Sequence, residues 1–416
     1  MLISNLPHKI FLYIFSFLYI FNPGNFAPFN LLYVLGLFSF FYLYLNKITL
    51  FKFLSNKRIF LLIFICLVYF LYLLVQYFFG GNDAILRAYS FIILIVSLLC
   101  SLTVIIVFEK TYSLNFYNLM KFIVVVALIQ LFFVYLSVLV PSFREWTLST
   151  ARQSDILTIS NDAGSGLRSF GLASGYTSTF PMVMGVCALF SFYLFVLNKN
   201  IKDKLFYFII FLLIVFSVIL NARVGLVPIG LMLIFSPIFL LRNDKKNFLI
   251  LSVILSVILF LPNINIGNSD YFFRFVQGLN EFDSLLDGKK TGTFETLSGM
   301  WFFPSSTLGL LFGDGYKILG ASPRGSDIGI VQDIYMFGVI PSFILGCAIT
   351  YIFYPLIGYL RNKCGLFFTS ILVVSLVIYY LKGMGFYAND VINLLFIMLS
   401  FVVVTYIRNG RYGKLN

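Results

Sequence analysis

Apolar stretches separated by short polar connectors dominate this sequence and limit what it can fold into. A helix that crosses the hydrocarbon core of a bilayer needs about 20 mainly apolar residues. Stretches of this kind, some of them shorter, cover residues 10–21, 28–45, 59–79, 85–108, 116–140, 178–197, 205–220, 226–241, 248–261, 330–360, 366–381 and 391–407. Backbone polar groups in lipid must be paired within the protein, which favours helices. We therefore expect an all-α integral membrane protein with about 12 transmembrane helices, forming a single polytopic domain over residues 1–416.

Charge is scarce and unevenly placed. Charged residues make up 11% of the chain, against about 25% in soluble domains. Basic residues gather in alternate connectors: Lys47, Lys52, Lys57 and Arg58; Lys199, Lys202 and Lys204; Arg242, Lys245 and Lys246; Arg361 and Lys363; Arg408, Arg411 and Lys414. Cytoplasmic connectors are enriched in Lys and Arg, so we place these connectors and both termini in the cytoplasm. The net charge of +13 then indicates topology, and no nucleic-acid partner is expected.

The same alternation places two long polar connectors outside, residues 141–177 and 262–329. The other connectors on that face are short. Long connections on a rigid scaffold commonly carry binding and catalytic residues, so we expect the functional site on the outer face.

Arginine is frequent on that face, although the positive-inside preference acts against it. The outward arginines are Arg87, Arg144, Arg152, Arg168, Arg223, Arg274 and Arg324. Arg223 opens a helix that starts on the outer face, and Arg87 lies one turn into its helix. A guanidinium near a helix N-terminus is well suited to a phosphate group. The alternative is that each arginine contacts lipid headgroups or a connector carboxylate such as Asp83 or Asp155.

Two glycine-rich segments stand out in the outer connectors. Arg168 lies in "GSGLRSFG", where glycines let the backbone approach a ligand closely; a polar loop with an incidental arginine is the alternative. The segment "GDGYKILGASPRGSDIG" ends at the start of an apolar stretch. There Asp327 either holds an acceptor hydroxyl as base or orienter, or it pairs with Arg324 at a helix start that Ser326 or Asp327 caps. Glu295 and Asp314 are the next candidates for the base.

Residues that are missing exclude several chemistries. The only histidine is His8, on the expected cytoplasmic side, so histidine-dependent hydrolysis and histidine-ligated zinc on the outer face are excluded. No P-loop or Rossmann glycine pattern is present. We expect no cofactor and no metal.

Together these features resemble the Wzy-type O-antigen polymerases of Gram-negative bacteria. The resemblance rests on the topology, on "LFGDGYK…GSDIGIVQDIYMFGVIPSFILG", on "NARVG" at Arg223 and on "LRSFG" at Arg168. The long arginine-to-glycine spacing of some members does not follow from Arg168 or Arg274. The late-loop histidine of the related O-antigen ligases is absent, which favours a polymerase.

The resemblance implies a glycosyltransferase of the bacterial inner membrane whose active site faces the periplasm. It would transfer the growing glycan from undecaprenyl pyrophosphate to the sugar end of an incoming lipid-linked repeat unit. Asp327 and Arg223 would be catalytic, and Arg168, Arg274, Arg324 and Arg87 would bind substrate. Membrane lipid and a chain-length regulator protein are further candidate partners. An O-antigen ligase and a lipid-linked oligosaccharide flippase remain the alternatives.

Overall fold

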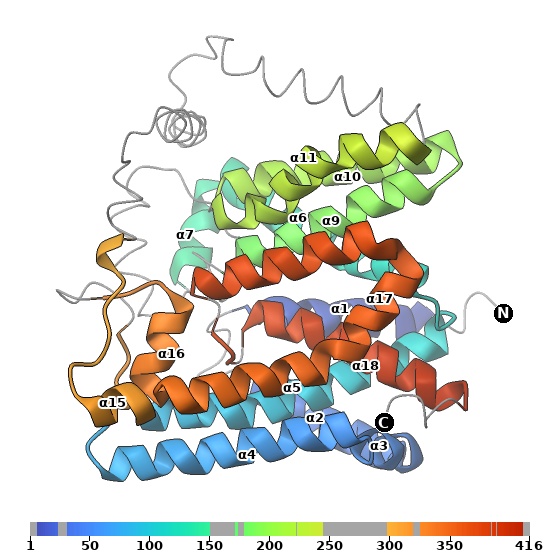
Figure 1. Cartoon of the computed structure of the whole chain (residues 1–416). Coiled ribbons are helices and arrows are strands. Elements are labelled where there is room, and N and C mark those ends of the chain that lie inside the picture. Colours follow the sequence, from blue (N-terminus) through green and yellow to red (C-terminus); the bar gives the residue numbers. More distant parts are fainter. Residues whose placement is uncertain are drawn as a thin grey trace. The chain divides into compact units, whose positions relative to one another are not determined.

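The structure is a computed structural model (Figure 1) that describes residues 6–23, 31–149, 171–173, 179–221, 223–243, 298–318, 325–383, 385–387 and 389–410. All regular structure in these ranges is helical. Contacts divide the chain into two compact units. The first unit comprises Met1–Asn118, Thr296–Lys363 and Val377–Asn416, and the second comprises Leu119–Glu295 and Cys364–Leu376.

Within the described ranges, six helices are long and apolar enough to cross a membrane. They are α4 (Lys57–Phe78), α5 (Ala84–Thr111), α6 (Phe116–Leu139), α9 (Thr179–Leu197), α17 (Val339–Leu381) and α18 (Asp390–Arg408). A seventh span results if α2 (Leu31–Leu45) and α3 (Lys47–Leu54), which are bent by 106° at their junction, count as one. The chain is therefore an all-α, multi-pass membrane protein.

The remaining helices are shorter or more charged. They are α1 (Leu6–Phe21), α7 (Pro141–Ser149), α10 (Ile201–Ile219), the 3₁₀ helix η1 (Arg223–Leu226), α11 (Val227–Asn243), α15 (Thr307–Phe312) and α16 (Gly329–Phe337). Of these, α7 and α15 lie in the connectors 141–177 and 262–329, where no helix was predicted. The predicted stretch 248–261 lies outside the described residues.

Two glycines break the late helices. At 43 residues, α17 is long enough for two spans, and Gly365 interrupts it with a φ of 85°. This break falls between the predicted stretches 330–360 and 366–381. The stretch 330–360 is itself divided, because Gly338 has a φ of 83° and separates α16 from α17. Only glycine adopts such a backbone conformation readily, and the continuous apolar pattern conceals the break.

In the first unit, α5 packs against α1, α2, α4 and α18. Buried polar side chains join three of these helices. The Tyr19 hydroxyl lies 2.8 Å from Ser97 Oγ, which donates to Asn393 Oδ1 at 2.7 Å, and Asn393 Nδ2 returns a hydrogen bond to the Tyr19 carbonyl at 2.9 Å. Polar groups in an apolar interior are costly unless paired, so these bonds fix how α1, α5 and α18 face one another.

In the second unit, α9 packs against α10, η1 and α11. The Ser191 hydroxyl donates to the Tyr207 carbonyl at 2.8 Å and joins α9 to α10. Gly225 of η1 lies against the Pro181 carbonyl, where a side chain would not fit. Arg223, one of the predicted catalytic residues, therefore begins a short helix held closely against α9.

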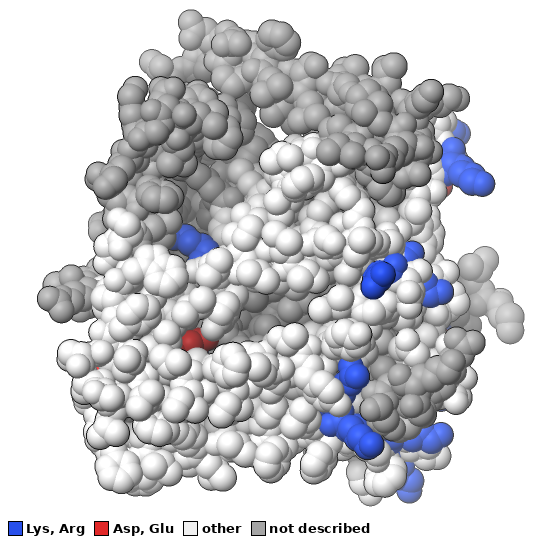
Figure 2. Space-filling view, viewed as in Figure 1, with Lys and Arg blue, Asp and Glu red and all other residues white. Residues whose placement is uncertain are grey.

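Charges of the first unit separate along α5. Arg87 and Glu109 are near opposite ends of this helix, about 33 Å apart along its axis. Among the described residues, the basic end carries Lys9, Lys47, Lys52, Lys57, Arg58, Lys110, Arg361, Lys363 and Arg408 with Glu109, and the acidic end carries Asp83, Asp314, Asp327, Asp333 and Asp390 with Arg87, Lys317 and Lys382. In Figure 2, blue side chains gather at the lower right, where Figure 1 places α3, and the surface between the ends is largely uncharged.

Candidate functional site

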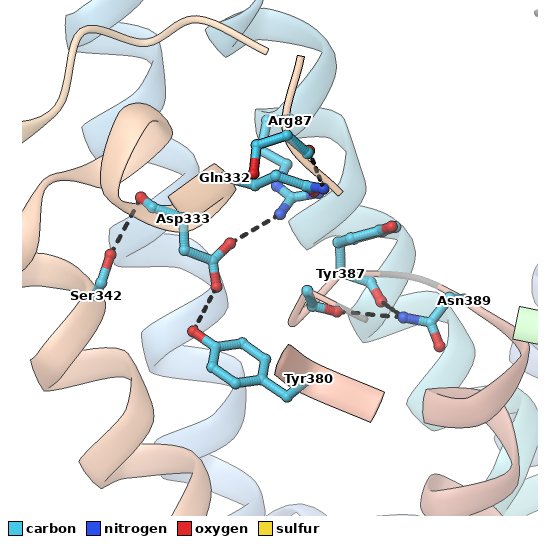
Figure 3. Close-up of polar contacts among 9 residues, drawn as sticks. Arg87, Gln332, Asp333, Ser342, Tyr380, Tyr387 and Asn389 are labelled. Atoms are coloured by element: carbon cyan, nitrogen blue, oxygen red, sulfur yellow. Dashed lines mark hydrogen bonds and ion pairs between the residues drawn. The ribbon is translucent and has the colours of Figure 1, made fainter. Parts of the chain in front are cut away.

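A buried ion pair lies at the acidic end of the first unit (Figure 3). Arg87, in the first turn of α5, places Nη2 3.1 Å from Oδ1 of Asp333 in α16. The Tyr380 hydroxyl, at the end of α17, donates to Asp333 Oδ2 at 2.8 Å. Ser342 Oγ donates to the backbone carbonyl of Asp333 at 3.1 Å. Side chains from α5, from α16 and from both ends of α17 therefore meet at Asp333.

Both members of the pair are removed from water. The Asp333 side chain is 3% exposed and the Arg87 side chain 15%. Burial raises the pKa of the Asp333 carboxyl, whereas the charge of Arg87 and the hydrogen bond from Tyr380 lower it. α16 is not among the spanning helices, and its partner Arg87 is in the first turn of α5. The Asp333 carboxylate therefore lies at one end of the first unit. Breaking such a pair is costly, since it leaves a buried charge without a partner.

Arg87 is also held by aromatic rings. Its guanidinium carbon lies 4.0 Å from the centre of the Tyr387 ring and 5.8 Å from that of Phe337. Nε of Arg87 is buried and has no hydrogen-bond partner among the described residues. The pair with Asp333 uses one nitrogen of the fork, so the guanidinium retains donors for a further acceptor.

The segment after α17 closes over this arginine. A Cβ added to Gly385 would lie 2.7 Å from Cε1 of Tyr387 and 2.8 Å from Nη2 of Arg87, so a larger residue there would displace the side chains of this site. Asn389 Nδ2 donates to the carbonyls of Gly385 and Tyr387 at 3.2 and 2.9 Å (Figure 3). Gly383 has a φ of 104°, and a Cβ there would lie 2.6 Å from the Asp327 carbonyl oxygen. One short segment thus lies between Arg87 and the start of α16.

The turn Gly313-Asp314-Gly315 docks beside the same site. Gly313 has a φ of 79°, and a Cβ there would lie 2.6 Å from the carbonyl carbon of Phe337, at the end of α16. The backbone N–H of Asp314 donates to the Tyr335 carbonyl at 2.8 Å. Asp83, just before α5, accepts from the backbone N–H of Lys317 at 2.9 Å. The turn is therefore fixed against both α16 and the start of the helix that carries Arg87.

Asp327 does not cap the helix, and that interpretation was wrong. The N-cap of α16 is Ile328, without a side-chain cap. Ser326 Oγ accepts from the Ile328 N–H at 3.2 Å and donates to the Met300 carbonyl at 3.0 Å. The Asp327 side chain is half-exposed, and its Oδ2 lies 3.8 Å from Lys382 Nζ. Its carboxylate is thus accessible, beside a cation, at the edge of the site.

Most of the other predicted site residues lie outside the part of the chain that the structure describes. Arg223 begins η1 in the second unit, and its side chain is outside the described part of the structure. Arg168, Arg274 and Arg324, with the alternative base Glu295, also lie outside the described residues. Arg87, Asp327 and the glycine turn are therefore the predicted features that the structure locates.

Asp333 was missed by the sequence analysis. It lies inside the apolar stretch "IVQDIYMFG", which was treated as part of a spanning helix. A carboxylate within such a stretch is costly unless a cation pairs with it. Arg87 is another charge at the edge of an apolar stretch. Pairing the carboxylate of Asp333 with this cation is the step that could have identified both residues from the sequence.

Among the described residues, no group of three or more His, Cys, Asp or Glu side chains could hold a metal ion. Comparison of the chain with protein-family models, with curated proteins and with solved structures finds no match.

Proposed function

We propose that the chain is an O-antigen polymerase, a glycosyltransferase at the periplasmic face of the bacterial inner membrane. It transfers a growing glycan from undecaprenyl pyrophosphate to an incoming lipid-linked repeat unit. The proposal includes about 12 transmembrane helices and periplasmic connectors at 141–177 and 262–329. The observation that carries it is the meeting of Arg87 with the glycine turn and the Asp327 segment, all singled out in the sequence, at one end of the first unit.

The orientation is supported by the separation of charge in the first unit. Nine of the ten charged residues assigned to the basic end are Lys or Arg, whereas five of the eight at the acidic end are Asp. Lys and Arg are enriched on the cytoplasmic side of membrane proteins. The acidic end, which holds the Arg87–Asp333 pair, then faces the periplasm.

In this proposal Arg87 binds the pyrophosphate leaving group. As the bond between sugar and phosphate breaks, negative charge increases on the phosphate oxygen, and a fixed guanidinium stabilises that charge. Asp333 and the Tyr387 ring hold the guanidinium in place, and its Nε has no hydrogen-bond partner among the described residues. Arg223, Arg168, Arg274 and Arg324 remain further candidates for the same anionic group.

Asp327 accepts or orients the proton of the acceptor sugar hydroxyl. Its half-exposed side chain is accessible to the sugar end of the incoming repeat unit, whereas Asp333 is buried and occupied by Arg87 and Tyr380. Transfer joins the acceptor oxygen to the anomeric carbon, releases undecaprenyl pyrophosphate and leaves the proton on the carboxylate. Asp333 is thus a positioning residue.

The experiment is deletion of the gene in its host, followed by complementation and separation of the lipopolysaccharide ladder. Loss of a polymerase leaves core carrying one repeat, loss of a ligase leaves bare core with accumulated lipid-linked polymer, and loss of a flippase leaves repeats inside the cell. Arg87→Lys and Asp327→Asn should fail to restore the long ladder at normal protein level. Arg408→Lys, in the exposed pair with Glu109 at the basic end, is the matched control and should restore it.

A bare-core deletion phenotype would overturn the proposal in favour of a ligase. A normal ladder from Asp327→Asn would show that Asp327 is not the base, because an amide cannot accept the proton.

A further inference from the structure

The short helix α3 turns sharply away from α2 at the basic end of the first unit. α2 ends at Leu45, and α3 is bent from it by 106°. Lys110, in the last turn of the spanning helix α5, donates to the Tyr42 hydroxyl at 2.9 Å, so α2 and α5 end side by side. With 8 residues, α3 is about 12 Å long and too short to cross the hydrocarbon core. It therefore runs along the end of these helices and does not continue α2 across a bilayer.

Side-chain hydrogen bonds fix the direction of α3. Where the chain enters it, Asn46 Nδ2 donates to the Tyr42 carbonyl at 2.8 Å. Where the chain leaves it, Asn56 Oδ1 accepts from the N–H groups of Arg58 and Ile59 at 3.1 and 3.3 Å and caps α4. Both turns are thus specified by the sequence next to α3.

One face of α3 is exposed and combines apolar with basic side chains. Phe53 is fully buried and holds α3 against the first unit. On the other side Ile48 is 70% and Phe51 74% exposed, and Lys47 and Lys52 are exposed as well. Each lysine is four residues from one of these apolar side chains, so all four share one face. Apolar side chains among lysines on an exposed helix are typical of the membrane interface.

The cations of this segment are not neutralised by acidic side chains of the described residues. No Asp or Glu precedes Asp83 in the sequence. Glu109, the acidic residue of the basic end, pairs with Arg408 at 2.7 Å. The side chains of Lys47 and Lys57 make no hydrogen bond or ion pair within the described part of the chain. Their charges are therefore available to an anionic partner.

Arg58, in the first turn of α4, adds a cation that rests on aromatic rings. Its guanidinium carbon lies 4.8 Å from the centre of the Tyr351 ring and 5.9 Å from that of Tyr354. These rings belong to α17 and are on residues that are 45% and 65% exposed, as expected for tyrosines at a lipid–water boundary. Arg58 Nη1 donates to the Tyr351 carbonyl at 3.4 Å, and no described carboxylate pairs with the guanidinium. A guanidinium held in this way is suited to a phosphate.

We propose that α3 and the start of α4 bind the headgroups of anionic phospholipids. Ile48 and Phe51 enter the outer part of the acyl chains. Lys47, Lys57 and Arg58 contact the phosphates, since basic residues at a membrane surface attract anionic lipids. The exposed apolar side chains favour a lipid over a soluble phosphate ester. The surface lies at the opposite end of the first unit from the candidate functional site, and the inference does not rest on the proposed function.

The test uses the full-length protein in phosphatidylcholine bilayers, with Phe51→Trp as a fluorescent reporter. Trp146→Phe and Trp301→Phe remove the two native tryptophans. Quenching by phosphatidylglycerol or phosphatidylcholine with brominated acyl chains gives the relative binding constant of the two lipids beside α3. Phosphatidylglycerol should be preferred, and Arg58→Gln and Lys47→Gln should each lower this preference by up to about fivefold.

Two controls belong to the same experiment. Phe78→Trp, a reporter at an 82% exposed position at the other end of α4, should be quenched equally by the two lipids. Lys317→Gln, which removes an exposed cation at the acidic end, should leave the preference of the Phe51→Trp reporter unchanged.

No quenching of the Phe51→Trp reporter by either lipid would overturn the proposal, because α3 would then not lie against the bilayer. Equal quenching by the two lipids, or a preference that neither Arg58→Gln nor Lys47→Gln changes, would overturn it as well. A preference that glycerol 3-phosphate abolishes at constant ionic strength would assign the cations to a soluble phosphate and contradict the lipid assignment.

Discussion

The burial of the Arg87–Asp333 pair predicts that replacing Asp333 lowers the free energy of unfolding more than replacing Arg87 does. In Asp333→Leu, Arg87 remains charged at any accessible pH and loses the carboxylate that pairs with it, while its side chain is only 15% exposed. Removing one partner of a buried pair costs about 3–5 kcal/mol. Because Arg87 keeps some exposure and still stacks on Tyr387, we expect a loss near 3 kcal/mol in the free energy of unfolding.

In Arg87→Met, by contrast, the buried carboxyl can become neutral by binding a proton while it keeps the hydrogen bond from Tyr380. We expect a smaller loss, about 1–2 kcal/mol, at low pH. Without the guanidinium, burial still raises the Asp333 pKa, and the hydrogen bond from Tyr380 is the remaining influence that lowers it. A carboxyl whose pKa is raised in the folded state stabilises most below its unfolded pKa, and this stability is lost as pH rises through the folded value.

The assay is unfolding of the purified protein in mixed micelles, followed by circular dichroism, from about pH 5 to about pH 8. Arg87→Met should lose stability with rising pH, by at most about 1.4 kcal/mol per pH unit between the two pKa values, and Asp333→Leu should not show this extra dependence. The double variant should be more stable than the sum of the single losses predicts. Glu109→Gln, in the partly exposed pair with Arg408, should cost about 0–1 kcal/mol.

Equal losses of unfolding free energy for Arg87→Met and Asp333→Leu at every pH would refute the reasoning. They would show that the Asp333 carboxyl does not become neutral by binding a proton. Additive losses in the double variant would show that the two side chains do not interact energetically.

Three further outcomes are expected. Gly338→Ala should destabilise the protein by about 1–3 kcal/mol in the same unfolding assay, because its φ of 83° is strained for other residues. Gly346→Ala, with open space around it, should be neutral or stabilising. In a background without native cysteines, Lys317→Cys should react with a membrane-impermeant maleimide in cells with a permeabilised outer membrane. Lys47→Cys should react only after the inner membrane is opened. The reverse pattern would invert the proposed orientation. Tyr380→Phe should cost about 0.5–1.5 kcal/mol, and an unchanged melting temperature would show that its hydrogen bond to the buried carboxylate contributes nothing.

The helices were largely predictable because length and apolarity decide them in lipid. A helix covers each predicted stretch that falls within the described residues. The breaks were not predictable, since Gly338 and Gly365 sit in apolar surroundings like Gly346, which continues its helix. Gly338 and Gly365 differ from Gly346 in the backbone conformation that tertiary packing imposes. This conformation cannot be predicted from the single sequence.

The candidate site was predictable in part for a related reason. Arg87 and the glycine turn were identified by their position at helix ends, a local property. Asp333 acquires its role from a partner 246 residues away, and the sequence does not measure that proximity. The Asp327 side chain is half-exposed, and the cap that was considered for it is absent.

The hydrogen bonds that join Tyr19, Ser97 and Asn393 have a consequence for biosynthesis. Tyr19 and Asn393 are separated by 374 residues, and translation adds about 5–20 residues per second. The first helix is therefore synthesised about 20–75 seconds before α18. During this time the first unit cannot close, and its polar side chains need a temporary partner such as lipid headgroups, water or an insertase. The buried hydrogen bonds of this unit are thus completed only after α18 has been made.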